Sequence, residues 1–299
     1  MTYNVPCWNN LTFIRGPSKG RYPFCHSLYL DDDVKVIVDP AADPEELKRI
    51  RDDKGVDVVL LSHYHEDHWT FMHLFPKAKI YIHEEDAPAM ADLKTLLDFY
   101  GMEQDAPETE RYCRELENFF HYNPKPPDKT FRQGDLLEFG RARIEVIHTP
   151  GHSPGHSCFY FREQDVLFLA DYDLTRFGPW YGDRVSDIDM FVGSSELVRH
   201  HHAKTKITAH EEGVLTGDLN DLWVGYMEVI DRRQKALEAA LRGGPKTIEE
   251  IIALRIVYGK VREPKSFFDF GERGIMLKHL ERMISKGIVM LRDGRYRLL

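Results

Sequence analysis

The feature that most limits the fold of this chain is a histidine-rich string at residues 62–68, which reads Ser-His-Tyr-His-Glu-Asp-His. It directly follows an apolar run that is typical of a buried strand. Side chains two residues apart in extended backbone point the same way, so His63 and His65 can bind one metal from one face. If a helix begins next, Asp67 and His68 project from its first turn towards a second ion. A single histidine near a strand end is usually a packing residue, but the complete string indicates a site for two metals.

Three further candidates for metal binding lie later in the chain, each after a strand-like run. His152 lies in the motif Thr-Pro-Gly-His, Asp171 follows the run Val-Leu-Phe-Leu-Ala, and His210 follows Lys-Ile-Thr-Ala. Together with the string, these residues resemble the metallo-β-lactamase superfamily, whose hallmark is the pattern His-x-His-x-Asp-His. The resemblance implies two metal sites that share one carboxylate: a first site of His63, His65 and His152, a second site of Asp67, His68 and His210, and Asp171 as the bridge.

The resemblance also implies the chemistry of this centre. A water or hydroxide would share the bridge between the metals, with Asp67 and Asp171 as the carboxylates that take part in catalysis. Imidazole and carboxylate ligands suit zinc, and iron and manganese accept similar ligands, so two zinc ions per chain are the first expectation. Two such ions can lower the pKa of bound water towards about 7 and stabilise an oxyanion. Asp39 matches the aspartate that supports the metal-binding loop of this family without touching the metal.

Strands and helices alternate along the first two thirds of the chain, which indicates an α/β fold. The motif Asp-Pro-Glu-Glu predicts the start of a helix over residues 43–54. With the resemblance, residues 1–218 are expected to form a metallo-β-lactamase αββα sandwich whose ligand loops lie at strand ends. The strands predicted in its first half are residues 11–15, 24–30, 34–39 and 78–83.

Residues 86–123 are predicted to be a helical insertion, because leucine and aromatic residues recur there at helical spacing. The Pro-Lys-Pro-Pro that follows ends the pattern. Two interpretations stay open: a cap that lines a substrate pocket with aromatic side chains, or a packed helical hairpin without substrate contact. After the bridging aspartate, four more side chains can either face the pocket or pack within the loop: Tyr172, Arg176, Trp180 and Tyr181.

Residues 219–299 form a separate C-terminal part with a different charge. From Asp231 to the end there are 16 Lys and Arg against 9 Asp and Glu, a balance of +7, which leaves −16 for the preceding residues. Helices at 219–241, 247–257 and 273–286, followed by a hairpin around Asp-Gly, resemble a winged helix. This part can bind nucleic acid, form a homodimer contact or complete the pocket wall, although the acidic body disfavours non-specific binding to nucleic acid.

The substrate is less constrained than the metals. Residues 149–161 resemble the corresponding stretch of glyoxalase II thioesterases, which favours acyl hydrolysis. Ala170 stands where a glycine often precedes the bridging aspartate, and residues 209–212 read Ala-His-Glu-Glu instead of Pro-Gly-His-Gly. The first hypothesis is a dinuclear hydrolase of a small ester, thioester or lactone. The alternatives are a metal-dependent nuclease of single-stranded nucleic acid, which would bind in a strongly salt-dependent way, and a mononuclear iron dioxygenase of persulfides.

Composition limits the class of protein and its compartment. The 299 residues are 42% hydrophobic with a formal net charge of −9, which is ample for a globular core. The chain start lacks the segments of a secretory signal, and no apolar run reaches membrane-spanning length, so we expect a cytoplasmic protein without membrane contact. Because the four cysteines form no Cys-x-x-Cys pair, reduced thiols are expected at Cys7, Cys25, Cys113 and Cys158.

Overall fold

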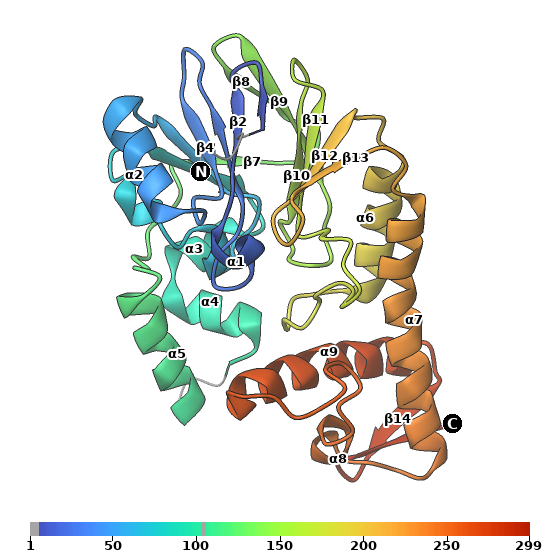
Figure 1. The fold of residues 1–299 in the computed structure, drawn as a ribbon. Coiled ribbons are helices and arrows are strands. Elements are labelled where there is room, and N and C mark those ends of the chain that lie inside the picture. Colours follow the sequence, from blue (N-terminus) through green and yellow to red (C-terminus); the bar gives the residue numbers. More distant parts are fainter. Residues whose placement is uncertain (1–5, 103–105) are drawn as a thin grey trace.

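Two mixed β-sheets packed face to face form the centre of the computed structural model, which describes residues 6–102 and 106–299 (Figure 1). Helices cover the outer face of each sheet, which confirms the predicted αββα sandwich. The prediction that the chain has no secretory signal depends partly on residues 1–5. Residues 103–105 belong to the predicted insertion. Both segments lie outside the described residues.

The first sheet is built in chain order from the N-terminal half of the chain. Its neighbours β1 to β4 pair antiparallel, and β4 to β7 pair parallel. Strands β4 and β5 are completely buried, as their uninterrupted valine, isoleucine and leucine residues predict. The strands are β1 (Cys7–Trp8), β2 (Leu11–Ile14), β3 (Ser27–Leu30), β4 (Val36–Val38), β5 (Val58–Leu60), β6 (Lys79–His83) and β7 (Lys129–Phe131).

The second sheet has the strand order β13-β12-β11-β10-β9-β8. Its neighbours pair antiparallel except β11 and β12, which are parallel and therefore end at the same edge of the sheet. The pairing of these two strands is irregular between Phe168 and Ala170, directly before the predicted bridging aspartate. The strands are β8 (Leu136–Phe139), β9 (Ala142–His148), β10 (Ser157–Phe161), β11 (Val166–Ala170), β12 (Thr205–Thr208) and β13 (Val214–Thr216).

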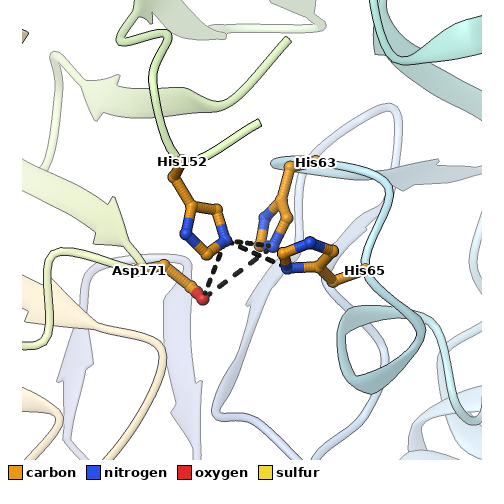
Figure 2. Close-up of side chains that lie close together, drawn as sticks. All are labelled: His63, His65, His152 and Asp171. Atoms are coloured by element: carbon orange, nitrogen blue, oxygen red, sulfur yellow. Dashed lines mark hydrogen bonds and ion pairs between the residues drawn. The ribbon is translucent and has the colours of Figure 1, made fainter. Parts of the chain in front are cut away.

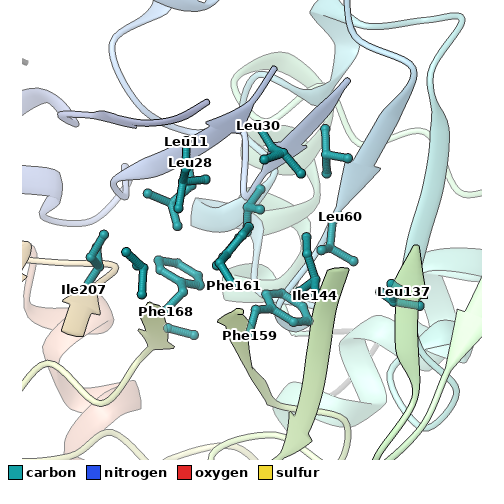
Figure 3. Close-up of a cluster of buried hydrophobic side chains, with 14 of the residues drawn as sticks. Leu11, Leu28, Leu30, Leu60, Leu137, Ile144, Phe159, Phe161, Phe168 and Ile207 are labelled. Carbon is teal, nitrogen blue, oxygen red and sulfur yellow. The ribbon is translucent and has the colours of Figure 1, made fainter. Parts of the chain in front are cut away.

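The main hydrophobic core is the layer between the two sheets (Figure 3). Leu28 and Leu30 of β3 lie in this layer, whereas Tyr29 between them packs under the helices outside the first sheet. In the second sheet, Phe159 of β10 lies in the same layer and its neighbour Cys158 faces the outer helices. This alternation follows from the two-residue period of a strand, and it buries both faces of each sheet.

The helices outside the first sheet include the predicted insertion. Helix α2 (Pro44–Asp53) begins where the sequence predicts, because Asp43 accepts hydrogen bonds from the backbone N–H groups of Glu45 and Glu46. The insertion is helical, as expected, and consists of α3 (Ala87–Ala91), α4 (Leu93–Tyr100) and α5 (Pro107–Asn118). Short turns complete this half: α1 (Pro17–Gly20), and the 3₁₀ helices η1 (Glu66–His68) and η2 (Met72–Leu74).

Helices α6 (Ile188–Arg199) and α7 (Asn220–Arg242) cover the second sheet, and α7 continues into the C-terminal region (Figure 1). That region contains α8 (Ile248–Ile252), α9 (Lys265–Ser285) and a hairpin of β14 (Val289–Arg292) and β15 (Arg295–Leu298). The predicted order of helices and hairpin is present, and the assignment as a winged helix stays a prediction. In the described ranges, no helix combines the length and apolar character that crossing a membrane requires.

Two predicted helix boundaries in the C-terminal region are wrong. Helix α8 ends at Ile252 instead of 257, and α9 begins at Lys265, eight residues before the predicted start. Gly271 and Gly274 lie inside α9, where they serve close packing. A Cβ atom on Gly274 would lie 2.1 Å from the carbonyl oxygen of Gly182, so only glycine lets α9 approach that loop.

Candidate metal centre

Four segments bring the predicted ligands to one edge of the sandwich. The histidine-rich string follows β5, and the loops of His152, Asp171 and His210 follow β9, β11 and β12. Because β11 and β12 are parallel, Asp171 and His210 leave the second sheet at the same edge. The structure thus brings all seven predicted residues together in two adjoining groups, His63, His65, His152 and Asp171 in the first, and Asp67, His68 and His210 in the second.

In the first group, three rings and one carboxylate converge on a common point (Figure 2). His152 Nε2 lies 3.1 Å from His63 Nε2 and 3.0 Å from His65 Nδ1. It also lies 3.2 Å from Asp171 Oδ2, and the ligand atoms of the group are all within 4.8 Å of one another. Two imidazole nitrogens and a carboxylate oxygen at such distances from a third nitrogen form a compact donor set for one cation.

In the second group, the other carboxylate oxygen of Asp171 takes part. Asp171 Oδ1 lies 2.9 Å from His68 Nε2 and 3.4 Å from His210 Nε2. Asp67 Oδ2 lies 3.8 Å from the same nitrogen of His210. Asp171 therefore presents Oδ2 to the first group and Oδ1 to the second, which is the arrangement that a bridging ligand requires.

Each histidine of the two groups is held by a partner on the ring nitrogen that points away from the centre. Such contacts fix the tautomer and the orientation of a metal-binding imidazole. The contact between Asp39 and His68 confirms the predicted support of the loop. The five pairs are His63 Nδ1 with Ser62 Oγ (3.0 Å), His65 Nε2 with Asp183 Oδ2 (2.6 Å), His68 Nδ1 with Asp39 Oδ2 (2.8 Å), His152 Nδ1 with the Trp180 carbonyl (3.0 Å), and His210 Nδ1 with the Gly20 carbonyl.

The electrostatics of the centre favour a bound cation. Burial opposes charge on His65, but the carboxylates of Asp183, Asp67 and Glu66 together outweigh burial and raise the pKa of His65 to about 9. Burial likewise opposes charge on His210, whose pKa the neighbouring carboxylates raise to about 10. Moreover, His68 Nε2 and Asp171 Oδ1 are buried and lie 2.9 Å apart, but neither atom makes a hydrogen bond of good geometry, to the other or to any further group. A divalent metal supplies both the positive charge and the missing partner, so these residues fit a metal centre.

Two carboxylates that support the centre were missed in the sequence. Asp183 is fully buried and, besides His65, accepts a hydrogen bond from the Tyr64 hydroxyl at 2.5 Å. Asp173 accepts a hydrogen bond from the backbone N–H of His210 at 3.2 Å, and burial raises the pKa of Asp173 to about 7. Asp173 could have been suspected because it stands two residues after Asp171. Asp183 carries no such signal, since it lies 118 residues from its partner.

A third missed carboxylate, Asp86, joins two ligand loops. Its carboxylate accepts hydrogen bonds from the Tyr64 backbone N–H (3.2 Å), the Ser153 hydroxyl (2.7 Å) and the Gly155 backbone N–H (2.7 Å). Burial raises the pKa of Asp86 to about 7. Asp86 stands at the predicted start of the insertion, and no role at the metal centre was predicted for it.

The loop of residues 177–184 is held in place by the C-terminal region. This loop supplies both the Trp180 carbonyl and Asp183, the partners of two histidines in the first group. Arg233 of α7 is buried beside the loop, and its guanidinium donates to the carbonyls of Pro179 (2.8 Å) and Phe177 (2.9 Å) and to the hydroxyl of Tyr181 (3.1 Å). The C-terminal region therefore helps to position the first group of ligands.

A pocket of about 430 Å³ opens from the centre. Its lining comes from the ligand loops, from the insertion through Tyr100 and Tyr112, and from the C-terminal region through Tyr258 and Phe267. The insertion is therefore a cap that contacts the pocket, and the C-terminal region completes the wall, which was one of its three predicted roles. Of the four side chains suggested after Asp171, Trp180 lines the pocket, Arg176 is exposed, and Tyr172 and Tyr181 are buried in the core.

Comparisons with known proteins agree with this geometry. An atrochrysone carboxyl ACP thioesterase of Pseudocercospora fijiensis is 24% identical over 243 residues, which are 77% of this chain and 60% of that protein. A hydroxyacylglutathione hydrolase of Haemophilus influenzae is 29% identical over 154 residues, 49% of this chain and 65% of that protein. The matches thus span less than two thirds of the length of either curated relative.

The whole fold has a counterpart among solved structures. A metallo-beta-lactamase family protein from Thermus thermophilus superposes with a TM-score of 0.69 at 25% identity, covering 97% of this chain and 99% of that one. The match therefore includes most of the C-terminal region. A sequence model described as the metallo-beta-lactamase superfamily matches residues 23–248, most of the chain. The chain belongs to the metallo-β-lactamase superfamily.

Proposed function

We propose that the protein is a dinuclear metal-dependent hydrolase that cleaves a small ester, thioester or lactone. The observation that supports this most directly is Asp171, whose two carboxylate oxygens face the two groups of ligands. Two bound ions, zinc first and iron or manganese as alternatives, would lower the pKa of a water and stabilise the oxyanion formed when it attacks a carbonyl. His63, His65 and His152 would hold the first ion, Asp67, His68 and His210 the second, and Asp171 both.

The acyl class of substrate is supported by the relatives and by the charges around the pocket. One relative is named a thioesterase and the other a hydroxyacylglutathione hydrolase. A nuclease needs cations for phosphate groups, but both arginines of the pocket lining, Arg21 and Arg111, already have partners on the protein. Nucleic-acid binding by the basic C-terminal region therefore remains a secondary proposal. A homodimer contact through the same region is a further secondary proposal.

The test is a comparison of carbonyl and phosphate substrates after controlled metal loading. Protein stripped with a chelator and reloaded with zinc, manganese or iron would be assayed on phenyl acetate, an acyl thioester and a lactone. Parallel assays would use bis(p-nitrophenyl) phosphate, single-stranded RNA, and oxygen uptake with a persulfide. We expect metal-dependent hydrolysis of a carbonyl substrate. Turnover of RNA or of the persulfide alone would contradict the proposal and favour the nuclease or the dioxygenase.

A further inference from the structure

Part of the pocket wall is aromatic, and α9 contributes to it. Phe267 and Phe268 lie in the first turn of this helix, which begins at Lys265 after Pro264. Their rings lie 5.4 Å apart, and Phe268 meets Tyr258 edge to face at 5.0 Å. The rings therefore form a continuous surface rather than isolated contacts.

The wall is continued by residues from two other parts of the chain. Phe177, six residues after the bridging aspartate, stacks on Tyr258 at 5.6 Å. Tyr22 packs against Phe267 at 5.4 Å. Phe267 keeps 44% of its surface exposed and Phe177 keeps 41%, although both are large apolar side chains that line the pocket. Exposed aromatic rings on the wall of a concave site indicate a surface that an apolar ligand covers.

The charges of the pocket disfavour an anionic ligand. Arg21 binds Glu211 through two hydrogen bonds of 2.6 and 3.0 Å. Arg111 donates to the Ser266 hydroxyl at 2.9 Å and lies 4.0 Å from Glu115. Among the lining residues that the structure describes, these are the two arginines and there is no lysine, while several lining residues are acidic. A carboxylate or phosphate on the acyl group would thus meet negative charge or have to replace an existing ion pair.

We propose that this pocket binds the acyl group of an uncharged ester or thioester with a bulky, aromatic or otherwise apolar acyl part, and that Phe267, Phe268 and Tyr258 determine this specificity. The proposal rests on the hydrolase function proposed above and names its substrate class. The cavity of about 430 Å³ is large enough for such a group, since small-molecule sites begin near roughly 300 Å³. The C-terminal region then acts in substrate selection.

The proposal is tested with thioesters that share one leaving group and differ in the acyl part: acetyl, hexanoyl, naphthoyl and carboxynaphthoyl. Each methylene buried against the wall is worth about fourfold in kcat/KM, so hexanoyl should exceed acetyl by on the order of 10²-fold. Naphthoyl should exceed carboxynaphthoyl. Equal rates for acetyl and hexanoyl, or faster turnover of the carboxylated substrate, would overturn the proposal while leaving the hydrolase function intact.

A pair of variants assigns the selectivity to the wall. Phe267→Ala should reduce the ratio of naphthoyl to acetyl turnover by on the order of tenfold, because it removes a ring that the ligand covers. Phe119→Ala is the matched control, since Phe119 is similarly exposed at 42% but lies outside the pocket lining. Equal ratios in the two variants would contradict the role of the α9 wall.

Binding is measured separately from hydrolysis with a naphthylmethyl thioether that lacks the scissile carbonyl, by titration calorimetry. We expect the thioether to bind wild type and the Phe119→Ala variant alike and Phe267→Ala more weakly. Thioether binding without hydrolysis of any ester would overturn the hydrolase function and keep the apolar site. Hydrolysis of acetyl thioester without thioether binding would overturn the apolar site alone.

Discussion

The metal centre and the aromatic pocket wall lie next to each other but are built in opposite ways. The centre consists of polar side chains, nearly all buried, whose outward atoms each have a fixed partner, such as Asp39 for His68. The wall consists of partly exposed rings such as Phe267, contributed by α9 and by loops. The difference indicates that the rigid sandwich sets the reaction, whereas the segments added to it select the substrate.

The two regions are connected by the loop of residues 177–184. Phe177 at its start belongs to the wall, while Asp183 near its end holds His65 of the centre. Arg233 of α7 binds the loop between them. Substitutions in the centre, in this connection and in the C-terminal region should therefore differ in the size of their effects.

The largest effect is expected from Asp171→Ala, which removes an oxygen from both groups of ligands. We expect kcat/KM for acyl substrates to fall by at least on the order of 10³-fold, because neither ion keeps its shared ligand. Bound metal should fall in parallel, and the wall should still bind the naphthylmethyl thioether. Substantial activity with a full complement of metal in this variant would show that Asp171 is not the bridge.

Asp183→Asn should have an intermediate effect on the centre. The substitution keeps the size of the side chain but removes the charge that orients His65, and loss of such a partner typically costs about 10- to 100-fold in metal affinity or activity. Metal affinity would be measured by competition with a chromogenic chelator. Glu117→Gln, an exposed carboxylate on α5, is the control and should leave the affinity unchanged.

Arg233→Met tests the connection between the two regions. The variant leaves the carbonyls of Phe177 and Pro179 without their donor inside the protein, which should lower the free energy of unfolding by about 3 kcal/mol. Metal affinity should fall less than in Asp183→Asn, by about tenfold or less. Chemical denaturation measures the stability, with Arg232→Met, its exposed neighbour, as control. Equal stability of the two variants would mean that α7 does not hold the loop.

The smallest effect concerns the pH dependence of stability. His279 of α9 is fully buried, its Nε2 lies 3.0 Å from the Tyr181 hydroxyl, and burial lowers its pKa from 6.5 to about 3. Below pH 6.5 His279 binds a proton in the unfolded chain but stays neutral in the folded protein. The free energy of unfolding therefore falls as the pH drops towards 3. At pH 5 this loss is about 2 kcal/mol. Denaturation at pH 7.5 and 5 should show this extra loss in wild type but not in His279→Gln.

The metal centre was largely predictable because its residues stand at positions that sequence patterns mark. Residues 63–68 follow a strand and share one loop, and Asp171 and His210 each end an apolar run. The resemblance to the metallo-β-lactamase superfamily identified the seven residues, and their places after strands agreed with a site at one edge of the sheets.

The loop of residues 177–184 and the aromatic pocket wall were less predictable from the sequence, for a physical reason. Asp183 reaches His65 from a loop without regular structure, and no spacing in the sequence relates the two. The C-terminal region was left with three possible roles, since its docking depends on long-range packing. Gly271 and Gly274 of α9 illustrate this limit, because they allow a close contact with Trp180 and Gly182 that no spacing in the sequence indicates.

The most direct test of the account is the metal content of wild type and of the His68→Ala variant, measured by elemental analysis after purification without added metal. His68 belongs to the second group of ligands only. We predict about two ions per chain in wild type, with zinc as the main metal, falling towards one in the variant. A single iron per chain that the substitution leaves unchanged would contradict the dinuclear hydrolase and favour the mononuclear dioxygenase.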